Sequence, residues 1–565
     1  MIETILTPTA LWKNFILPDG VSATVVQERK RGNVVFSKLY IEGRNVGQES
    51  VKIYAELVRN VKKATAPAII LLEDFEIKQD KKLIKTLLSK GYSVLTVDLY
   101  GKKQDKERFT VYPEQISYAN YEEVKDNLYE IQTNAQQTCW YEWCAVLRYA
   151  LKYLKGLPFI NKVGALGFSK VATALWQVAG TDENLDCVSV ALNSGWLGYK
   201  EIFKFGGMVE PQFSDQMYKF VAGVDSQSYA LHVKCPTLML CATNDPNFDL
   251  DRAYDTLSKV PDTVFKAMHY SVNTIDRIDN DGFNNLMNFF NKFLLEKEID
   301  LIKESQIKCE VKDGKLVVEI DTDELSEVQV KRVNVYVAEQ KVNPALRSWL
   351  KVDARKVDKN KYVGEYQPYY ASELLTCFAT VEFSNGFKAS TNVLGKRFNQ
   401  DEVKKTNKNN LIFSSRMLNS ESVFAPLSSL EDDYALNIDV SDKGKVELKK
   451  GPMDIVGVGC TRDLTTFAVG SDRYQPVNNS IIMLDVFVRE SAMLTVSFVV
   501  DALGEKKEYF AQSNLLGGDV WLNVQFPMNK FKTAEGLVLK DFSKVDALKI
   551  SVDGSEYLVN NLLWV

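Results

Sequence analysis

The stretch Val163-Gly164-Ala165-Leu166-Gly167-Phe168-Ser169-Lys170-Val171-Ala172 decides the fold. Its first half is a run of apolar and small residues that ends in a glycine-x-serine turn, and a helical pattern follows through Leu175 and Val178. A serine between a buried strand and a helix lies on a strained turn at the carboxyl edge of a sheet, where backbone amides and the helix N-terminus face its hydroxyl. Ser169 is therefore the candidate nucleophile of an acyl-transfer site.

Short apolar runs before and after this stretch predict further strands of the same kind. They cover residues 68–72, 92–97, 188–192 and 237–241, with helical segments between them. One of these segments has an apolar stripe at i+3 and i+4 spacing, formed by Trp140, Trp143, Leu147, Leu151 and Leu154. Continuous apolar strands are covered on both faces, so the pattern predicts a mostly parallel α/β sheet with crossover helices over residues 66–300.

The remaining chain divides into three further parts. Residues 1–65 alternate apolar and polar at period two, which predicts an antiparallel β extension of the α/β domain. Residues 301–400 and 401–565 contain many short strands separated by turn residues, and a lysine- and asparagine-rich stretch over residues 403–410 lies near their junction. We expect a small Ig-like β-sandwich followed by a jelly-roll-like β-sandwich.

The composition limits the possible partners. Of the 565 residues, 45% are hydrophobic and 25% are charged, as in soluble globular proteins. The 69 basic and 74 acidic residues give a formal charge of −5, so no broad positive field is present for nucleic acid or anionic membranes. The N-terminus lacks a basic region followed by an apolar region, and no run of ~18 apolar residues occurs. We expect a cytoplasmic protein without nucleic-acid or membrane partners.

Metal and cofactor sites are not expected. The eight cysteines lie mostly in apolar runs, which predicts reduced thiols in the core, and no pair has C-x-x-C spacing. The chain contains two histidines, His232 and His269. So few nitrogen ligands argue against a transition-metal site.

The partners of a serine nucleophile are sought after the later strands, because the order serine, acid, histidine is typical of this fold class. Asp245 follows the run 237–241 and is the candidate acid; the alternative is that it only caps the turn made by Asn244 and Pro246. His269 is the candidate base; the alternative is a histidine at a strand end that packs or meets solvent.

From about residue 39 to residue 295, the chain resembles the acetylxylan-esterase and cephalosporin-C-deacetylase-like branch of the α/β-hydrolases. The resemblance is carried by Leu39-Tyr40-Ile41-Glu42-Gly43-Arg44, Thr138-Cys139-Trp140-Tyr141-Glu142-Trp143, Gly167-Phe168-Ser169-Lys170, and Asn244-Asp245 with Leu250-Asp251-Arg252-Ala253-Tyr254-Asp255. It implies an esterase for small acyl esters, such as acetylated sugars. Ser169 would be the nucleophile and Asp245 the acid, with Lys170 and Phe168 contributing to the oxyanion site or the pocket.

Three departures from this branch favour a degenerate site. Relatives carry the histidine in a loop resembling Ser-x-Asn-x-x-His-Arg-Ile, whereas the stretch Ser271-Val272-Asn273-Thr274-Ile275-Asp276-Arg277-Ile278 has Asp276 in that place. The oxyanion turn has Glu73 and Asp74, whose charge is of the wrong sign near a developing oxyanion. Val171 replaces the second glycine of the serine turn. Two functions remain open: an esterase using Ser169, Asp245 and His269, or a catalytically degenerate protein for binding or assembly.

The closing residues, 520–565, resemble carbohydrate-binding jelly rolls in their pattern. Trp521, Tyr557 and Trp564 could stack on sugar rings, or they could belong to the core of the sandwich. The expected partners are a small acyl-ester or sugar substrate if the site is active, and otherwise further copies or other proteins bound through the β domains.

Overall fold

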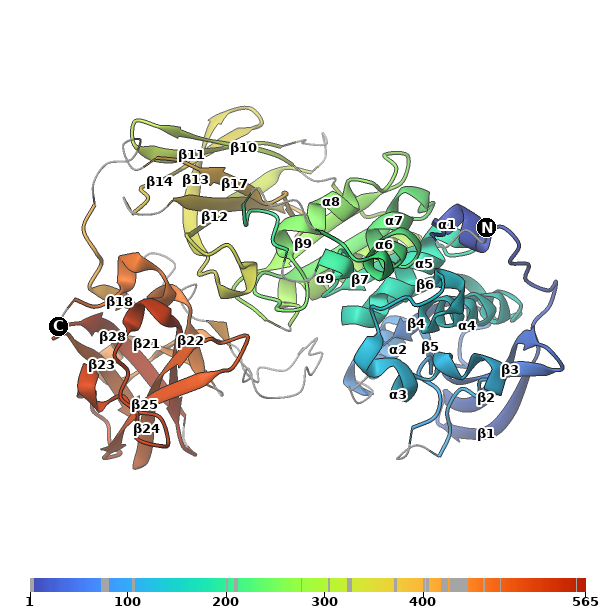
Figure 1. Ribbon diagram of the computed structural model, residues 1–565, viewed down its shortest axis with the longest axis horizontal. Coiled ribbons are helices and arrows are strands. Elements are labelled where there is room, and N and C mark those ends of the chain that lie inside the picture. Colours follow the sequence, from blue (N-terminus) through green and yellow to red (C-terminus); the bar gives the residue numbers. More distant parts are fainter. Residues whose placement is uncertain are drawn as a thin grey trace.

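The computed structural model describes residues 5–72, 81–103, 107–199, 202–207, 212–275, 277–302, 305–322, 328–369, 373–399, 402, 406–417, 425–426, 446–460, 463–477, 479–554 and 556–565. Figure 1 shows an α/β domain that carries the N-terminal half of the chain, and two β domains beside it. In the part of the chain that the structure covers, no helix has the length and apolarity needed to cross a membrane.

The α/β domain is built on one nine-stranded sheet in the order β1-β2-β3-β5-β4-β6-β7-β8-β9. The first three strands are antiparallel, β3 pairs antiparallel with β5, and the remaining pairs are parallel. The predicted fold class is confirmed, because a β extension continues into a mostly parallel sheet. The strands are β1 (Ala23–Arg31), β2 (Val34–Val46), β3 (Glu49–Asn60), β4 (Ala66–Leu72), β5 (Ser93–Val97), β6 (Ile160–Phe168), β7 (Cys187–Ala191), β8 (Thr237–Ala242) and β9 (Lys266–Ser271).

Helices cover both faces of this sheet. The strand β6 alternates between the two faces: Val163 and Ala165 pack in the same core as α4 and α5, whereas Leu166 and Phe168 pack in the core that holds α2 and α9. This arrangement explains why β6 is apolar at successive positions. The helices are α1 (Pro8–Trp12), α2 (Lys81–Lys90), α3 (Tyr121–Val124), α4 (Cys139–Lys155), α5 (Ala172–Thr181), α6 (Asp215–Gly223), α7 (Ser226–Tyr229), α8 (Ala253–Leu257) and α9 (Asn280–Phe293).

The first β domain is an antiparallel array that folds over a shared apolar core. Its strand β13 pairs with β12 along its first residues and with β14 along its last ones, so one strand belongs to both halves. The strands are β10 (Gln306–Lys312), β11 (Lys315–Asp321), β12 (Val330–Glu339), β13 (Leu350–Asp358), β14 (Lys361–Tyr366), β15 (Leu374–Phe383), β16 (Lys388–Ser390) and β17 (Leu394–Arg397).

The second β domain packs two antiparallel sheets around one core. One sheet has the order β20-β21-β28-β23-β26 with β18 paired to β28, and the other has the order β19-β22-β27-β24-β25. Tyr557 and Trp564 are buried in the core between them. The strands are β18 (Leu411–Phe413), β19 (Ala425–Pro426), β20 (Glu447–Lys450), β21 (Val456–Gly459), β22 (Leu464–Thr466), β23 (Ile481–Val488), β24 (Ala492–Val500), β25 (Lys507–Leu515), β26 (Leu522–Pro527), β27 (Val545–Val552) and β28 (Tyr557–Trp564).

The first β domain shares its apolar core with the α/β domain. Tyr270 on β9 contacts Phe378 on β15, with ring centroids 5.0 Å apart, and Trp349 contacts the same phenylalanine at 4.8 Å. Strands β11, β12 and β15 contribute to the same buried cluster as α2 and α9. The interface is therefore an apolar core of the kind found inside a domain.

Candidate active site

Ser169 lies on a strained turn between β6 and α5. Its φ is +52°, which is uncommon for a residue with a side chain, and a single 3₁₀ turn (Ser169–Val171) leads into the helix. A Cβ on Gly167 would lie 2.6 Å from Leu175 Cδ1, so only glycine lets strand and helix approach this closely. The turn has the backbone conformation of a nucleophile elbow.

A buried network of hydrogen bonds stabilises this turn. Asn193, two residues after β7, donates from Nδ2 to the carbonyl of Ser169 (2.8 Å) and to Thr173 Oγ1 (3.1 Å). Its Oδ1 accepts the N–H of Gly195 at 3.0 Å. Sequence reasoning missed Asn193, although it directly follows the apolar run next to the serine strand. Among the described residues, the Ser169 hydroxyl takes part in no hydrogen bond, and the side chain is 6% exposed.

The residues that flank Ser169 have different environments. Phe168 is 2% exposed and packs in the core on the α9 side of the sheet. Lys170 is half-buried, and Val171 is fully buried where the helix begins. The ring of Phe168 is thus part of the core, and the backbone of Lys170 lies in the turn beside the serine.

Asp245 follows β8 and forms a local turn. Its Oδ1 accepts the N–H of Asn247 at 2.8 Å, and the side chain is 7% exposed. This bond caps the turn, as expected from the alternative that Asp245 only caps the turn made by Asn244 and Pro246. The positions Glu73 and Asp276 lie outside the described residues, so their part in the site stays a prediction.

His269 is bound to the start of α9. Its Nε2 lies 3.0 Å from Asp279 Oδ1, and a Cβ built on Gly282 of that helix would be 3.1 Å from His269 Cδ2. Asp279 also caps the helix by accepting the Gly282 N–H at 2.7 Å. Burial acts to raise the pKa of Asp279, but the charge and hydrogen bond of His269, together with the Gly282 N–H, hold that pKa below its usual value. The imidazole of His269 therefore faces α9 and has a carboxylate partner there.

The strand register separates His269 from the serine. Phe168, Ala191, Leu240 and His269 are paired in one row across β6, β7, β8 and β9. Three strand spacings correspond to about 14 Å between the outer residues of this row. A histidine and a serine side chain joined by a hydrogen bond of about 3 Å span only about 10 Å between their Cα atoms. Among the described residues, the hydrogen bond of His269 Nε2 goes to Asp279, and none joins His269 to Ser169.

The second histidine lies at the opposite edge of the sheet. His232 is half-buried in the 3₁₀ turn Ala230–His232, which precedes the start of β8. Ser169 follows the carboxyl end of β6, and β6, β7 and β8 are parallel. The six residues of β8 alone span about 20 Å. Within the described residues, neither of the two histidines forms a hydrogen bond with Ser169.

The loops after β8 and β9 bind the first β domain. Asn244 donates from Nδ2 to the carbonyls of Ala345 (3.1 Å) and Arg347 (2.7 Å). Asn273 donates to the carbonyl of Trp349 (3.1 Å) and accepts its N–H (3.0 Å). The loops in which the acid and the base were expected therefore form the docking surface for residues 345–349.

Two further contacts strengthen this docking surface. Arg347 forms a bidentate ion pair with Asp251 at 2.5 and 2.7 Å, and both side chains are fully buried. Ile275, in the loop after β9, belongs to a buried apolar cluster with Phe467 and Val499 of the second β domain. The loop after β9 thus contacts both β domains.

No metal-binding cluster of three histidine, cysteine or acidic residues occurs in the part of the chain that the structure describes. All eight cysteines are free thiols, and all except the half-buried Cys309 are buried.

Comparison with known proteins gives one family match. Residues 54–268 match the model of the dienelactone hydrolase family. Among the curated proteins, none matches the chain significantly in sequence.

Similar solved structures include several esterases. The acetyl xylan esterase from Paenibacillus sp. R4 is 12% identical, covering 51% of this chain and 92% of that chain with a TM-score of 0.38. Acetyl xylan esterase 1 from Thermoanaerobacterium sp. JW/SL YS485 is 13% identical, with coverages of 49% and 87% and a TM-score of 0.36. The glucuronoyl esterase from Solibacter usitatus is 13% identical, with coverages of 50% and 90% and a TM-score of 0.34.

Proposed function

From the match of residues 54–268 to the dienelactone hydrolase family, we propose that the chain contains an α/β-hydrolase domain that has lost triad catalysis and serves as the core on which the two β domains assemble. The family match supports a hydrolase. The groups around Ser169 decide whether this chain still has the machinery.

The observation that carries the proposal is the placement of both histidines. A serine hydroxyl needs a base within hydrogen-bond reach, and imidazole is the base that fits this role at neutral pH. His269 faces α9 and bonds Asp279, while His232 lies near the amino edge of the sheet. Loss of a triad member such as the base lowers the catalytic rate by a factor on the order of 10⁴ to 10⁶.

The assembly role is supported by what the loops after β8 and β9 bind instead. Loops that present an acid and a base to a substrate need an open face at the carboxyl edge of the sheet. Here Asn244 and Asn273 use their side-chain amides for the backbone of residues 345–349. Arg347 then completes the contact through its buried pair with Asp251.

The second candidate function is hydrolysis of a small acyl ester, such as an acetylated sugar, through Ser169. The observation that favours it is the strained turn, since a serine with φ of +52° between strand and helix is the conformation that exposes a nucleophile to a substrate. In this case, the base that activates Ser169 and is oriented by Asp245 would have to be a group other than an imidazole of this chain.

A comparison of three proteins with p-nitrophenyl acetate and a fluorophosphonate probe separates the candidates. We expect wild type, Ser169→Ala and the matched buried control Ser189→Ala to hydrolyse the ester at the same rate, with no labelling of Ser169. The assembly proposal is rejected if wild type exceeds Ser169→Ala by more than about tenfold while Ser189→Ala keeps the wild-type rate, because only an activated Ser169 gives that pattern.

A further inference from the structure

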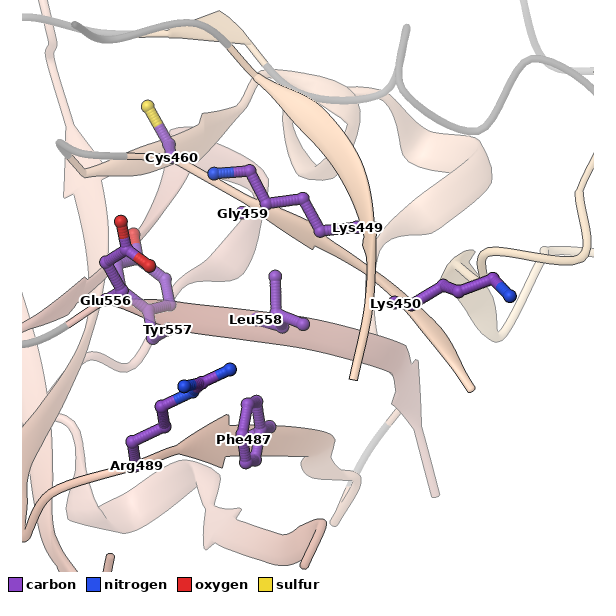
Figure 2. A pocket seen from close by; sticks show the side chains of 9 residues that line it. All are labelled: Lys449, Lys450, Gly459, Cys460, Phe487, Arg489, Glu556, Tyr557 and Leu558. Carbon is purple, nitrogen blue, oxygen red and sulfur yellow. The ribbon is translucent and has the colours of Figure 1, made fainter. Parts of the chain in front are cut away.

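The second β domain has a hollow on the outer face of one sheet. Strands β20, β21, β23 and β28 supply its walls and floor, and its volume is about 120 Å³. Figure 2 shows the lining residues, which are Lys449, Lys450, Gly459, Cys460, Phe487, Arg489, Glu556, Tyr557 and Leu558. Pockets for drug-sized ligands measure ~300 Å³ or more. This hollow therefore suits one small ring and not an extended molecule.

The floor of the hollow is apolar although it belongs to the outer face of the sheet. Leu558 and Phe487 are paired on β28 and β23, and they alternate with residues that face the core. A Cβ on Gly459 would lie 2.8 Å from Leu558 Cδ2, so the glycine lets the leucine lie flat on the sheet. The result is a narrow apolar floor, because Leu558 and Phe487 are only 6% and 8% exposed.

Trp521 extends this floor along the sheet. Its ring centroid lies 6.0 Å from that of Phe487. A Cβ on Gly457 would approach Trp521 Cη2 to 2.5 Å, so a second glycine makes room for the indole. Trp521 is half-exposed, unlike Tyr557 and Trp564 of the core.

Two cations lie on opposite sides of the hollow. Figure 2 shows Lys449 extending across Gly459 toward Cys460, and the guanidinium of Arg489 on the other side of Leu558, while Lys450 points away. Lys450 is 3.2 Å from Asp454, and the nearest carboxylate to Lys449 is that of Glu447 at 3.9 Å. Within the described residues, Arg489 has no ion pair.

One carboxylate, that of Glu556, lines the same hollow. It follows that the hollow is more positive than the chain as a whole, whose formal charge is −5. A guanidinium pairs best with a planar carboxylate, through two parallel hydrogen bonds. A carboxylate at the rim repels a simple anion but accepts hydrogen bonds from hydroxyl groups.

We propose that this hollow binds a single carboxylate-bearing sugar ring, of the uronic acid class. The sugar carboxylate pairs with Arg489, its C–H face lies toward Leu558 and Phe487, and its hydroxyls contact Lys449 and Glu556. This site is independent of the function proposed for the α/β domain, because none of its residues belongs to that domain.

Calorimetric titration of the full chain tests the ligand class. The probes are methyl β-glucuronide, the neutral methyl β-glucoside and sodium acetate, each at the same concentrations and ionic strength. We expect the glucuronide to bind at least tenfold more tightly than either comparison. The proposal is overturned if the glucuronide does not bind at millimolar concentration, if the glucoside binds equally well, or if acetate alone accounts for the affinity.

Matched variants test the site itself. Arg489→Gln should weaken glucuronide binding by at least tenfold, and Arg489→Lys should weaken it less, because the charge remains but the bidentate geometry is lost. Lys540→Gln, an exposed cation of the same β domain outside the hollow, should leave binding unchanged. Equal effects of Arg489→Gln and Lys540→Gln would mean that the ligand binds elsewhere and would reject the assignment.

Discussion

Replacing Asp251 by asparagine removes one charge from the buried pair that joins the α/β domain to the first β domain. The guanidinium of Arg347 would keep its two bonds to main-chain carbonyls, Nε to Lys341 (2.8 Å) and Nη2 to Val342 (3.0 Å). It would lose its only ion pair among the described residues, at a place where both side chains are 0% exposed. We expect an uncompensated buried cation, which is strongly destabilising.

The magnitude follows from that burial. Breaking a fully buried ion pair by changing one partner costs about 3–5 kcal/mol, whereas an exposed pair contributes about 0–1 kcal/mol. The exposed pair of Lys125 with Glu122, at 3.1 Å, provides the matched control through Glu122→Gln. Because a domain is stable by only about 5–15 kcal/mol, the loss at Asp251 is a large fraction of the whole.

Guanidinium titration followed by tryptophan fluorescence measures this loss, since Trp349 lies beside Arg347. Asp251→Asn should unfold at clearly lower denaturant concentration, and Glu122→Gln should match wild type. In the double variant with Arg347→Met, the cost should be smaller than the sum of the two single costs by at least about 2 kcal/mol. A loss below about 1 kcal/mol for Asp251→Asn, or additive costs, would refute the reasoning.

Three further outcomes are expected. Burial raises the pKa of Asp225 to about 6, although hydrogen bonds from backbone N–H groups act to lower it, so the folded state binds this proton more tightly than the unfolded chain. The free energy of unfolding of wild type, relative to that of Asp225→Asn, should therefore fall by on the order of 3 kcal/mol as pH rises from about 4 to about 6. A difference between the two proteins that stays constant in unfolding titrations at pH 4, 5, 6 and 7 would contradict this. Asp279→Ala should lower the melting temperature, because about 1 kcal/mol of helix capping is lost together with the partner of His269, and an unchanged calorimetric melting temperature would argue against it. Gly167→Ala should cost about 1–3 kcal/mol in a denaturant titration, since the new methyl group would meet Leu175 Cδ1 at 2.6 Å in a packed core; wild-type stability would show that β6 and α5 can separate freely.

The strands of the α/β domain were predictable because their burial is local in origin. The runs around residues 68–72, 163–166 and 237–241 lie in strands covered on both faces, so nearly every position is apolar and the pattern of continuous apolar residues indicates buried strands. The strained turn at Ser169 was predictable for a related reason, because a strand, a small-residue turn and a helix occur in direct succession.

The surroundings of Ser169 were not predictable from local pattern. Whether His269 faces the serine or α9 depends on strand register and on Asp279, ten residues later. The bonds from Asn244 and Asn273 reach residues about a hundred and about seventy-five positions further along the chain, and no periodicity reports such contacts. The aromatic residues of the last domain divide for the same reason: Tyr557 and Trp564 face the core, while Trp521 lies on the outer face over two glycines.

The contacts of Asn244 and Asn273 mean that selection can act on these loops through the stability of the domain interface. In an enzyme, selection for catalytic activity conserves the sequence of the loops beside a nucleophile, because variants that slow the reaction are lost. Here the same loops take part in joining the domains, so a substitution at Asn273 is exposed to selection through folding yield even if no substrate is ever converted. If catalysis is lost as proposed, Asn244, Asp251 and Asn273 should change together with residues 345–349 among natural variants of this chain, while Ser169 should drift to other small residues.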